Sequence, residues 1–120
     1  MTRGIKELSR LGSCFGATMD TFFGLAGIGD LIVTCSSVHS RNRKLGERIG
    51  KGIGLDDAMN RSHMIAEGVK TAYSIKKLSE KFDIEMPICS AVYNVLYENA
   101  DPVKEVDVLM SRDLKSESFI

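Results

Sequence analysis

The sequence lacks the features that define two large protein classes. No apolar run among its 120 residues approaches the roughly 18 residues of a membrane-spanning helix. Its 16 lysines and arginines are balanced by 16 aspartates and glutamates, so the basic excess that a nucleic-acid-binding surface requires is missing. The composition therefore argues against a membrane span and against a DNA- or RNA-binding domain.

Cysteine is also scarce, since Cys14, Cys35 and Cys89 form an odd and widely spaced set. Such a set fits neither a disulfide framework nor a zinc site, and it is typical of a reducing compartment. Residues 1–20 do not combine a basic start with an apolar stretch, so no signal peptide is expected. We therefore expect a cytoplasmic protein without a bound metal, and we interpret Cys35 as a small buried apolar residue.

What the sequence does contain is apolar residues at helical spacing. Its 43% hydrophobic and 27% charged residues are globular values, and 120 residues suit one domain with its own core. No stretch alternates with the period of a half-buried strand, and both prolines, Pro87 and Pro102, stand where a helix can begin. The pattern predicts an all-α fold of about seven helices, from segments 2–11, 30–35, 41–49, 55–61, 67–82 and two that begin at the prolines, with a turn of helix within residues 17–23.

The most unusual stretch is residues 22–46, FFGLAGIGDLIVTCSSVHSRNRKLG. It contains three glycines at GxxGxG spacing: Gly24, Gly27 and Gly29. A helix would lose roughly 1 kcal/mol at each of them. Asp30 follows directly, then a short apolar run, Thr34 and a polar loop that leads to a basic segment. Close backbone approaches, an acid, a hydroxyl and basic residues within one short stretch indicate a site for a small anionic ligand.

The second half of this stretch predicts a helix whose start can bind an anion. Ser40 is a good N-cap, and Leu45 and Ile49 lie four residues apart on one helical face. A helix start offers free N–H groups and the positive end of the helix dipole. Arg41 adds a planar guanidinium that matches phosphate or carboxylate, and Asn42 adds an amide. The alternative is that Ser40 merely caps the helix and the arginines are solvated, and the residues alone leave both interpretations open.

Two glycine-rich patterns are not phosphate-binding loops. Residues 46–51, GERIGK, are one residue short of a Walker A motif and are followed by Gly52 where the motif needs serine or threonine. Residues 24–29, GLAGIG, do not follow the GxGxxG pattern, and no predicted strand precedes them. No dinucleotide-binding fold is therefore expected in this chain.

The stretch FFGLAGIGDLIVTC followed by SRNR resembles the substrate-domain signature of bacterial NAD(P)-dependent glycerol-3-phosphate dehydrogenases. The flanking segments MTRGIKELSRLG, MIAEGVKTA, DIEMPI and LMSRDLKSE resemble other blocks of that family, so the resemblance covers nearly all of residues 1–120. It implies a single helical domain like the C-terminal domain of 6-phosphogluconate dehydrogenase, which also favours helix over strand for residues 30–35. It implies too that the chain is the C-terminal part of a two-domain enzyme whose N-terminal Rossmann domain is absent here.

The resemblance assigns substrate contacts to five positions. Asp30 matches the acid that contacts the substrate beside a catalytic lysine, where its charge can tune the pKa of that lysine. Thr34 matches a hydroxyl that lines the same site. Ser40, Arg41 and Asn42 match the residues that hold the substrate phosphate. None of the lysines in this chain matches the catalytic lysine, which in the family lies upstream, so no catalytic base is expected within residues 1–120.

The resemblance also assigns contacts with the nicotinamide cofactor, NAD or NADP, to Arg41, Ile65 and Glu67. The simpler interpretation of Glu67 is that it only begins the long helix over residues 67–82. Because the cofactor domain lies upstream in the family, we expect no cofactor to bind this chain alone and no catalytic activity from it.

For the complete protein, the resemblance implies interconversion of sn-glycerol 3-phosphate and dihydroxyacetone phosphate by hydride transfer, for glycerophospholipid biosynthesis, by a cytoplasmic homodimer. The alternative is a non-catalytic helical module that binds an anion or a partner helix. A variant of this alternative places residues 41–51 on DNA, but the zero net charge and the glycine-rich segment argue against it.

Overall fold

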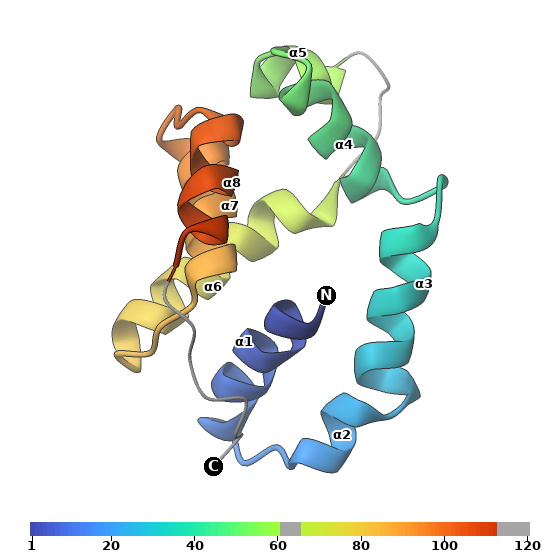
Figure 1. Ribbon diagram of the computed structural model, residues 1–120, viewed down its shortest axis with the longest axis vertical. Coiled ribbons are helices and arrows are strands. Elements are labelled where there is room, and N and C mark those ends of the chain that lie inside the picture. The colour runs from blue at the N-terminus through green and yellow to red at the C-terminus, as the bar shows by residue number, and fades with distance from the viewer. Residues whose placement is uncertain (61–65, 113–120) are drawn as a thin grey trace.

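The computed structural model describes residues 1–60 and 66–112, and these residues form helices with no strand among them (Figure 1). The elements are α1 (Thr2–Ser13), α2 (Met19–Phe23), the π-helix η1 (Leu25–Gly29), α3 (Asp30–Ser36), α4 (Arg41–Gly50), α5 (Leu55–Asn60), α6 (Glu67–Lys81), α7 (Pro87–Tyr97) and α8 (Pro102–Met110). The predicted all-α class is confirmed. The described residues hold eight α-helices rather than about seven, because residues 19–23, where a turn of helix was predicted, form the separate helix α2.

Helices α6, α7 and α8 pack in sequence, α6 on α7 and α7 on α8, and α1 lies against α7 (Figure 1). Tyr73 of α6 lies beside Tyr93 and Tyr97 of α7, and the rings of Tyr93 and Tyr97 stack with centroids 5.1 Å apart. The Tyr97 hydroxyl donates a hydrogen bond to the Val69 carbonyl oxygen across 2.7 Å. These contacts fix the rotation of α7 against α6, and therefore the direction in which the start of α6 points.

A second small core joins α4 and α5 to the start of α6. Leu45 and Ala58 are buried together with Ala66, and the partly buried side chains around them are Ile49, Ile53, Leu55, Met59 and Val69. Arg48 of α4 donates a hydrogen bond to the Ala58 carbonyl oxygen at 3.1 Å. This core holds the α4–α5 pair against the residues that lead into α6.

The glycine-rich segment predicted to be a tight passage forms the π-helix η1. The N–H of Gly29 donates to the Gly24 carbonyl oxygen, five residues back, at 3.2 Å. A Cβ atom at Gly27 would lie 2.2 Å from the backbone oxygen of Phe22, so only glycine fits between α2 and η1. π-Helical turns are concentrated at functional sites. Here the wide turn ends directly at Asp30, the first residue of α3.

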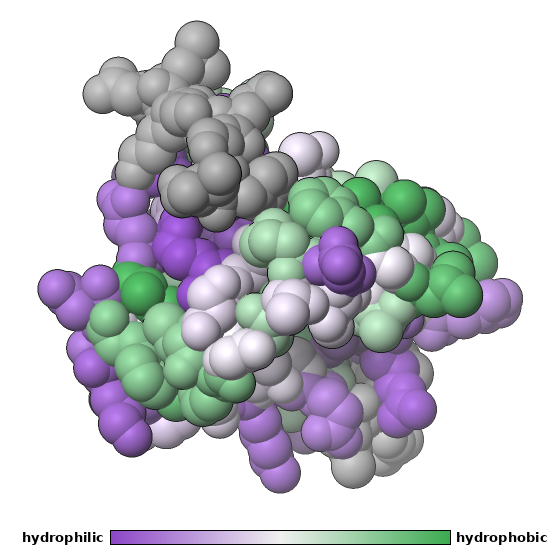
Figure 2. All heavy atoms as spheres, turned by 90° about the horizontal axis from the view of Figure 1, so that it is seen from below, coloured by the Kyte–Doolittle hydropathy of each residue, from purple (hydrophilic) through white to green (hydrophobic). Residues whose placement is uncertain are grey.

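Helices α2 and α3, joined by η1, form an arm, residues 19–36, that packs mainly within itself and leaves much apolar surface exposed. Its exposed apolar side chains include Phe23, Leu25, Ile32 and Val33, and Leu25 is 91% exposed. Figure 2 shows hydrophobic surface on the side of the molecule where α2 and α3 lie. Cys35 is exposed at the end of this arm, so the interpretation of Cys35 as a buried residue is wrong. The apolar run around it is not covered by the described residues.

None of the helices formed by residues 1–60 and 66–112 is long and apolar enough to cross a membrane.

Candidate functional site

The start of α4 has the geometry that the sequence predicts. Ser40 lies in extended backbone conformation before the helix, and its hydroxyl accepts a hydrogen bond from the Arg43 N–H at 3.3 Å. This confirms Ser40 as the N-cap. Arg41 is the first helical residue and is exposed, and its guanidinium has no hydrogen bond or ion pair with the other described residues. The fork of donors on Arg41 therefore stays available at a helix start that favours anions.

Arg43 differs from Arg41 although both are exposed on the same helix. The Arg43 Nε atom lies 3.4 Å from a carboxylate oxygen of Glu47, one turn further along α4. This exposed i,i+4 pair offsets the Arg43 charge locally and contributes little to stability. Of the two arginines at the start of α4, Arg41 is therefore the one whose charge is not offset by a carboxylate of the described residues.

The structure brings Asn42 to the start of a second helix. The Asn42 Oδ1 atom accepts a hydrogen bond from the Gly68 N–H at 3.0 Å, across 26 residues of sequence. Gly68 is the second residue of α6, and the residue at the N-cap position, Ala66, has no side chain that could cap the helix. Asn42 thus satisfies one of the free N–H groups of α6 from outside.

Gly68 is fitted closely to this contact. A Cβ atom added at Gly68 would lie 2.7 Å from Asn42 Oδ1 and 2.9 Å from its Cγ. Any side chain at position 68 would therefore push the Asn42 amide away from the start of α6. Glycine at position 68 therefore preserves the Asn42 contact through this close approach and not through an unusual backbone angle.

The residues assigned to the cofactor lie next to this contact. Glu67 is the first residue of α6, is exposed, and is adjacent in sequence to Gly68, so the starts of α4 and α6 place Arg41, Asn42 and Glu67 in one neighbourhood. Its backbone oxygen accepts a hydrogen bond from the Thr71 hydroxyl at 3.1 Å. Ile65, the remaining cofactor contact implied by the sequence, lies outside the described residues.

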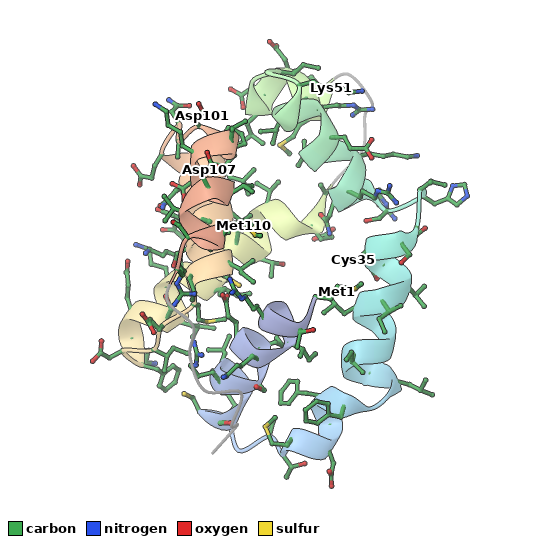
Figure 3. All side chains as sticks on the ribbon, in the orientation of Figure 1. Met1, Cys35, Lys51, Asp101, Asp107 and Met110 are labelled. Atoms are coloured by element: carbon green, nitrogen blue, oxygen red, sulfur yellow. The ribbon has the colours of Figure 1, made fainter. Side chains whose placement is uncertain are left out.

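Asp30 and Thr34 lie on the arm that precedes α4. They are one helical turn apart on α3, at i and i+4, so they share a face, and both are exposed. Figure 3 shows Cys35, the neighbour of Thr34, at the end of α3 from which the chain passes to α4. No hydrogen bond or ion pair joins Asp30 or Thr34 to residues 40–42 in the described part of the chain. The structure therefore links the α4 and α6 starts directly and places α3 next to them along the chain.

Sequence reasoning missed a buried acid elsewhere in the fold. Glu7 of α1 is 3% exposed, and its two carboxylate oxygens accept hydrogen bonds from the N–H groups of Ile88 at 2.5 Å and Cys89 at 3.1 Å. It thereby caps α7, whose N-cap residue Met86 has no capping side chain. Burial, and after it the charge and hydrogen bonding of the Glu7 carboxylate, together raise the pKa of the Cys89 thiol to about 12. The sequence did contain one sign of this contact. The N-cap position of α7 is apolar, so the N–H groups at the helix start require a partner from another element.

Metal binding finds no support in the described residues. No group of three or more histidine, cysteine, aspartate or glutamate side chains gathers there.

Three comparisons place the chain among known proteins. Residues 1–107 match the family described as NAD-dependent glycerol-3-phosphate dehydrogenase C-terminus. The chain is 51% identical over 119 residues to a Clostridium botulinum protein named glycerol-3-phosphate dehydrogenase (NAD(P)+), a match that covers 99% of this chain and 36% of the relative. A Salinibacter ruber protein of the same name, numbered 2, is 52% identical over 120 residues, with 100% and 35% covered.

A solved structure agrees with the sequence relatives. The crystal structure of glycerol-3-phosphate dehydrogenase from Coxiella burnetii superimposes with a TM-score of 0.89 at 39% identity, covering 92% of this chain and 34% of that one. The chain thus spans about a third of the length of the curated relatives it matches. Because the family match extends over most of its residues, the chain belongs to the family of NAD-dependent glycerol-3-phosphate dehydrogenase C-terminal domains.

Proposed function

We propose that this chain is the substrate-binding part of an NAD(P)-dependent glycerol-3-phosphate dehydrogenase. The complete protein interconverts sn-glycerol 3-phosphate and dihydroxyacetone phosphate. In the oxidising direction, the C2–H bond breaks with its electron pair moving to the nicotinamide, the hydroxyl proton leaves to a base, and a C2=O bond forms. The observation that carries the proposal is the Asn42–Gly68 contact, because it brings the predicted phosphate residues beside the predicted cofactor residue.

The start of α4 suits the phosphate end of this substrate. Arg41 supplies two parallel N–H donors, and the free N–H groups at the helix start supply more, so the doubly charged phosphate replaces its water with charge-assisted hydrogen bonds. Ser40 keeps the helix start in place through its bond to the Arg43 N–H. A phosphate held here fixes one end of a three-carbon substrate and leaves the other end for the reacting groups.

Asp30 suits the reacting end. It stands exposed at the first turn of α3, directly after η1, and Thr34 shares its face. In the complete protein we assign Asp30 the role of holding the charge of the catalytic lysine that the upstream part supplies. A carboxylate beside a lysine stabilises the charged ammonium, and so sets the pH range over which the lysine can exchange a proton with the substrate hydroxyl.

The described residues fit one edge of a nicotinamide dinucleotide and not its whole length. Arg41 and Glu67 offer an exposed cation and an exposed anion beside the joined helix starts. The strand, glycine-rich turn and helix that hold a pyrophosphate do not occur among the described residues, which contain no strand. When bound, NAD(P) supplies the hydride acceptor or donor. We therefore assign the main cofactor site to the part of the protein upstream of this chain.

The arm formed by α2, η1 and α3 supports a contact with that upstream part. Exposed Phe23, Leu25, Ile32 and Val33 give it an apolar surface larger than a free-standing domain usually leaves in water. Burial of this surface against a Rossmann domain would bring Asp30 and Thr34 to the domain junction. The homodimer and the cytoplasmic location remain predictions, and light scattering on the complete protein tests the first of them.

The proposed function is tested by arginine substitutions in the complete protein. Arg41→Ala removes charge-assisted hydrogen bonds worth about 1.5–3 kcal/mol, so the KM for dihydroxyacetone phosphate should rise about 10- to 100-fold. Arg43→Ala is the matched control, because Arg43 is paired with Glu47, and it should change this KM less than about threefold. Equal effects of the two substitutions would remove Arg41 from the site.

The isolated chain provides a second test of the proposed function. Residues 1–120 should give the circular dichroism of a helical protein that melts cooperatively. They should show no turnover of dihydroxyacetone phosphate with NADH or NADPH, because the cofactor has no complete site here. Turnover by the isolated chain would contradict the assignment of the cofactor site to an upstream domain.

A further inference from the structure

Asn42 joins two helices that sequence analysis treated separately. Its side chain leaves α4 one residue after Arg41, and its Oδ1 atom meets the Gly68 N–H of α6 at 3.0 Å. The local sequence of α6 supplies no alternative cap, since Ala66 occupies the N-cap position. The start of α6 thus depends on a side chain that belongs to the proposed phosphate site.

We propose that Asn42 is a positioning residue as well as a ligand contact: its amide caps α6 through Oδ1 and offers its NH₂ group to the substrate phosphate. This proposal rests on the proposed function. The cap fixes which way the amide points, because the backbone N–H of Gly68 can only donate and must face the oxygen of the amide. The NH₂ group then makes no hydrogen bond to the Gly68 N–H and keeps its two donors. A phosphate has only acceptors to offer at this position, so the two contacts do not compete.

The same contact couples the phosphate site to the cofactor side. Glu67 is adjacent to Gly68, so the backbone that carries the proposed cofactor contact is tied to the side chain that carries a phosphate contact. A phosphate that orders the Asn42 amide also orders the first turn of α6. Loss of the cap should therefore weaken binding of both reactants, although Gly68 touches neither of them in the proposed site.

Three substitutions separate the two roles of the amide. Asn42→Asp keeps an oxygen that can accept from Gly68 N–H but replaces the NH₂ donors with a negative charge. Asn42→Ala removes both. Gly68→Ala keeps Asn42 but places a methyl group where its amide lies, 2.7 Å from Oδ1. Gly46→Ala is the matched control for the last, because it is also a helical glycine and a Cβ atom there would meet nothing within 4 Å.

The cap is measured without any ligand. In NMR hydrogen exchange on the 120-residue chain, the backbone amide at position 68 should exchange at least about tenfold faster in Asn42→Ala than in the unsubstituted chain, since a lost hydrogen bond opens it to water. Asn42→Asp should keep the slow exchange, and Gly46→Ala should not alter it. Fast exchange in Asn42→Asp as well, or unchanged exchange in Asn42→Ala, would overturn the cap.

The coupling is measured in the complete protein by steady-state kinetics with dihydroxyacetone phosphate and NADH or NADPH. Asn42→Asp should raise the KM for the phosphate substrate about tenfold or more and leave the KM for the dinucleotide unchanged. Asn42→Ala and Gly68→Ala should raise both KM values, and Gly46→Ala neither. An unchanged dinucleotide KM in Gly68→Ala would overturn the positioning role.

Failure of the proposed function would look different. A complete, folded protein that neither binds nor turns over dihydroxyacetone phosphate would overturn the proposed function and the coupling with it. The contrast between Asn42→Ala and Asn42→Asp in hydrogen exchange would persist in that case, because the cap needs no ligand.

Discussion

Two regions of this molecule each contain a pair of capped helix starts, and they differ in what the caps leave free. At the starts of α4 and α6, Ser40 caps its own helix and Asn42 caps α6, and these residues lie at or near the surface. At the starts of α7 and α8, Glu7 caps α7 from a distance, and Asp101, which is labelled in Figure 3, caps its own helix. Each region thus has one local cap and one distant cap.

The α7 start is closed to ligands. Glu7 is buried and uses both carboxylate oxygens on backbone N–H groups, so no donor remains free at the helix start and a negative charge already stands there. An anion would be repelled. The α4–α6 region has a neutral amide and an exposed Arg41 instead, and an anion is attracted. A helix start is therefore not a binding site by itself. Whether a helix start can bind an anion depends on the charge of its cap and on whether that cap is buried.

The largest expected difference concerns the rate at which Cys89, in the first turn of α7, reacts with an alkylating reagent. Its pKa of about 12, raised by burial and by Glu7 from the ordinary value of 9.0, leaves little thiolate at pH 8, and its side chain is less accessible to a reagent than those of the exposed Cys14 and Cys35. Alkylation by iodoacetamide, followed by peptide mass spectrometry, should be at least about 100-fold slower at Cys89. Modification of Cys89 as fast as Cys14 would mean that α7 starts in contact with water.

The same thiol gives the stability a dependence on alkaline pH. The folded-state pKa of about 12 lies above the ordinary value of 9.0, so the folded protein keeps a proton that the unfolded chain loses. The contribution is fully present below about pH 9 and is lost as the pH rises from there toward 12. Cys89→Ser should flatten the urea-unfolding free energy over this interval. An equal slope in both proteins would show that the thiol is not responsible.

The next largest effect is expected from the buried cap itself. Glu7→Ala leaves two N–H groups of α7 without partners in a buried site, so the free energy of unfolding should fall by about 2–4 kcal/mol in urea denaturation. Glu47→Ala is the control, because its exposed pair with Arg43 is worth less than about 1 kcal/mol. If the two substitutions lower the free energy of unfolding equally, the α7 cap is not a structural requirement.

A substitution of Asp30 tests whether the arm acts together with the α4–α6 region, which is open to anions. In the complete protein, Asp30→Asn keeps the shape of the side chain and removes its charge, so kcat should fall about tenfold or more while KM changes less, and the pH–rate profile should shift. Asp20→Asn, another exposed acid in the first turn of a short helix, should change neither. If kcat and the profile stay unchanged in Asp30→Asn, the role of Asp30 is confined to the start of α3.

The sequence allowed accurate prediction of contacts that are local along the chain. Helix starts at Pro87, Pro102 and Arg41 match the structure, and the cap residues Ser40 and Asp101 bond to N–H groups two or three residues away. Periodicity and capping chemistry act over a few residues, so they can be recognised without tertiary structure. The burial of Cys35 was predicted wrongly for the complementary reason: its apolar run has no cover within the described residues.

The distant caps could not have been predicted in the same way. Glu7 and Ile88 are 81 residues apart, and Asn42 and Gly68 are 26 apart. Nothing within a few residues of Glu7 distinguishes it from a solvated acid on a helical face. What the sequence does contain is a need for such partners, because Ala66 and Met86 occupy N-cap positions and cannot satisfy the helix. The family resemblance predicts a phosphate contact for Asn42 and gives no indication of its bond to α6.

The smallest expected effects come from the two local caps, and they give the sharpest contrast between the regions. Ser40→Ala and Asp101→Ala each remove one side-chain bond to an exposed helix start, so each should lower the free energy of unfolding by about 1 kcal/mol. Only Ser40 lies beside Arg41, so only Ser40→Ala should also raise the KM for dihydroxyacetone phosphate in the complete protein, by several-fold. Equal stability losses make the KM difference a property of the location and not of the damage to a helix. A rise of the same size in Asp101→Ala would show that any weakened helix disturbs the site, and the distinction between an open and a closed region would then fail.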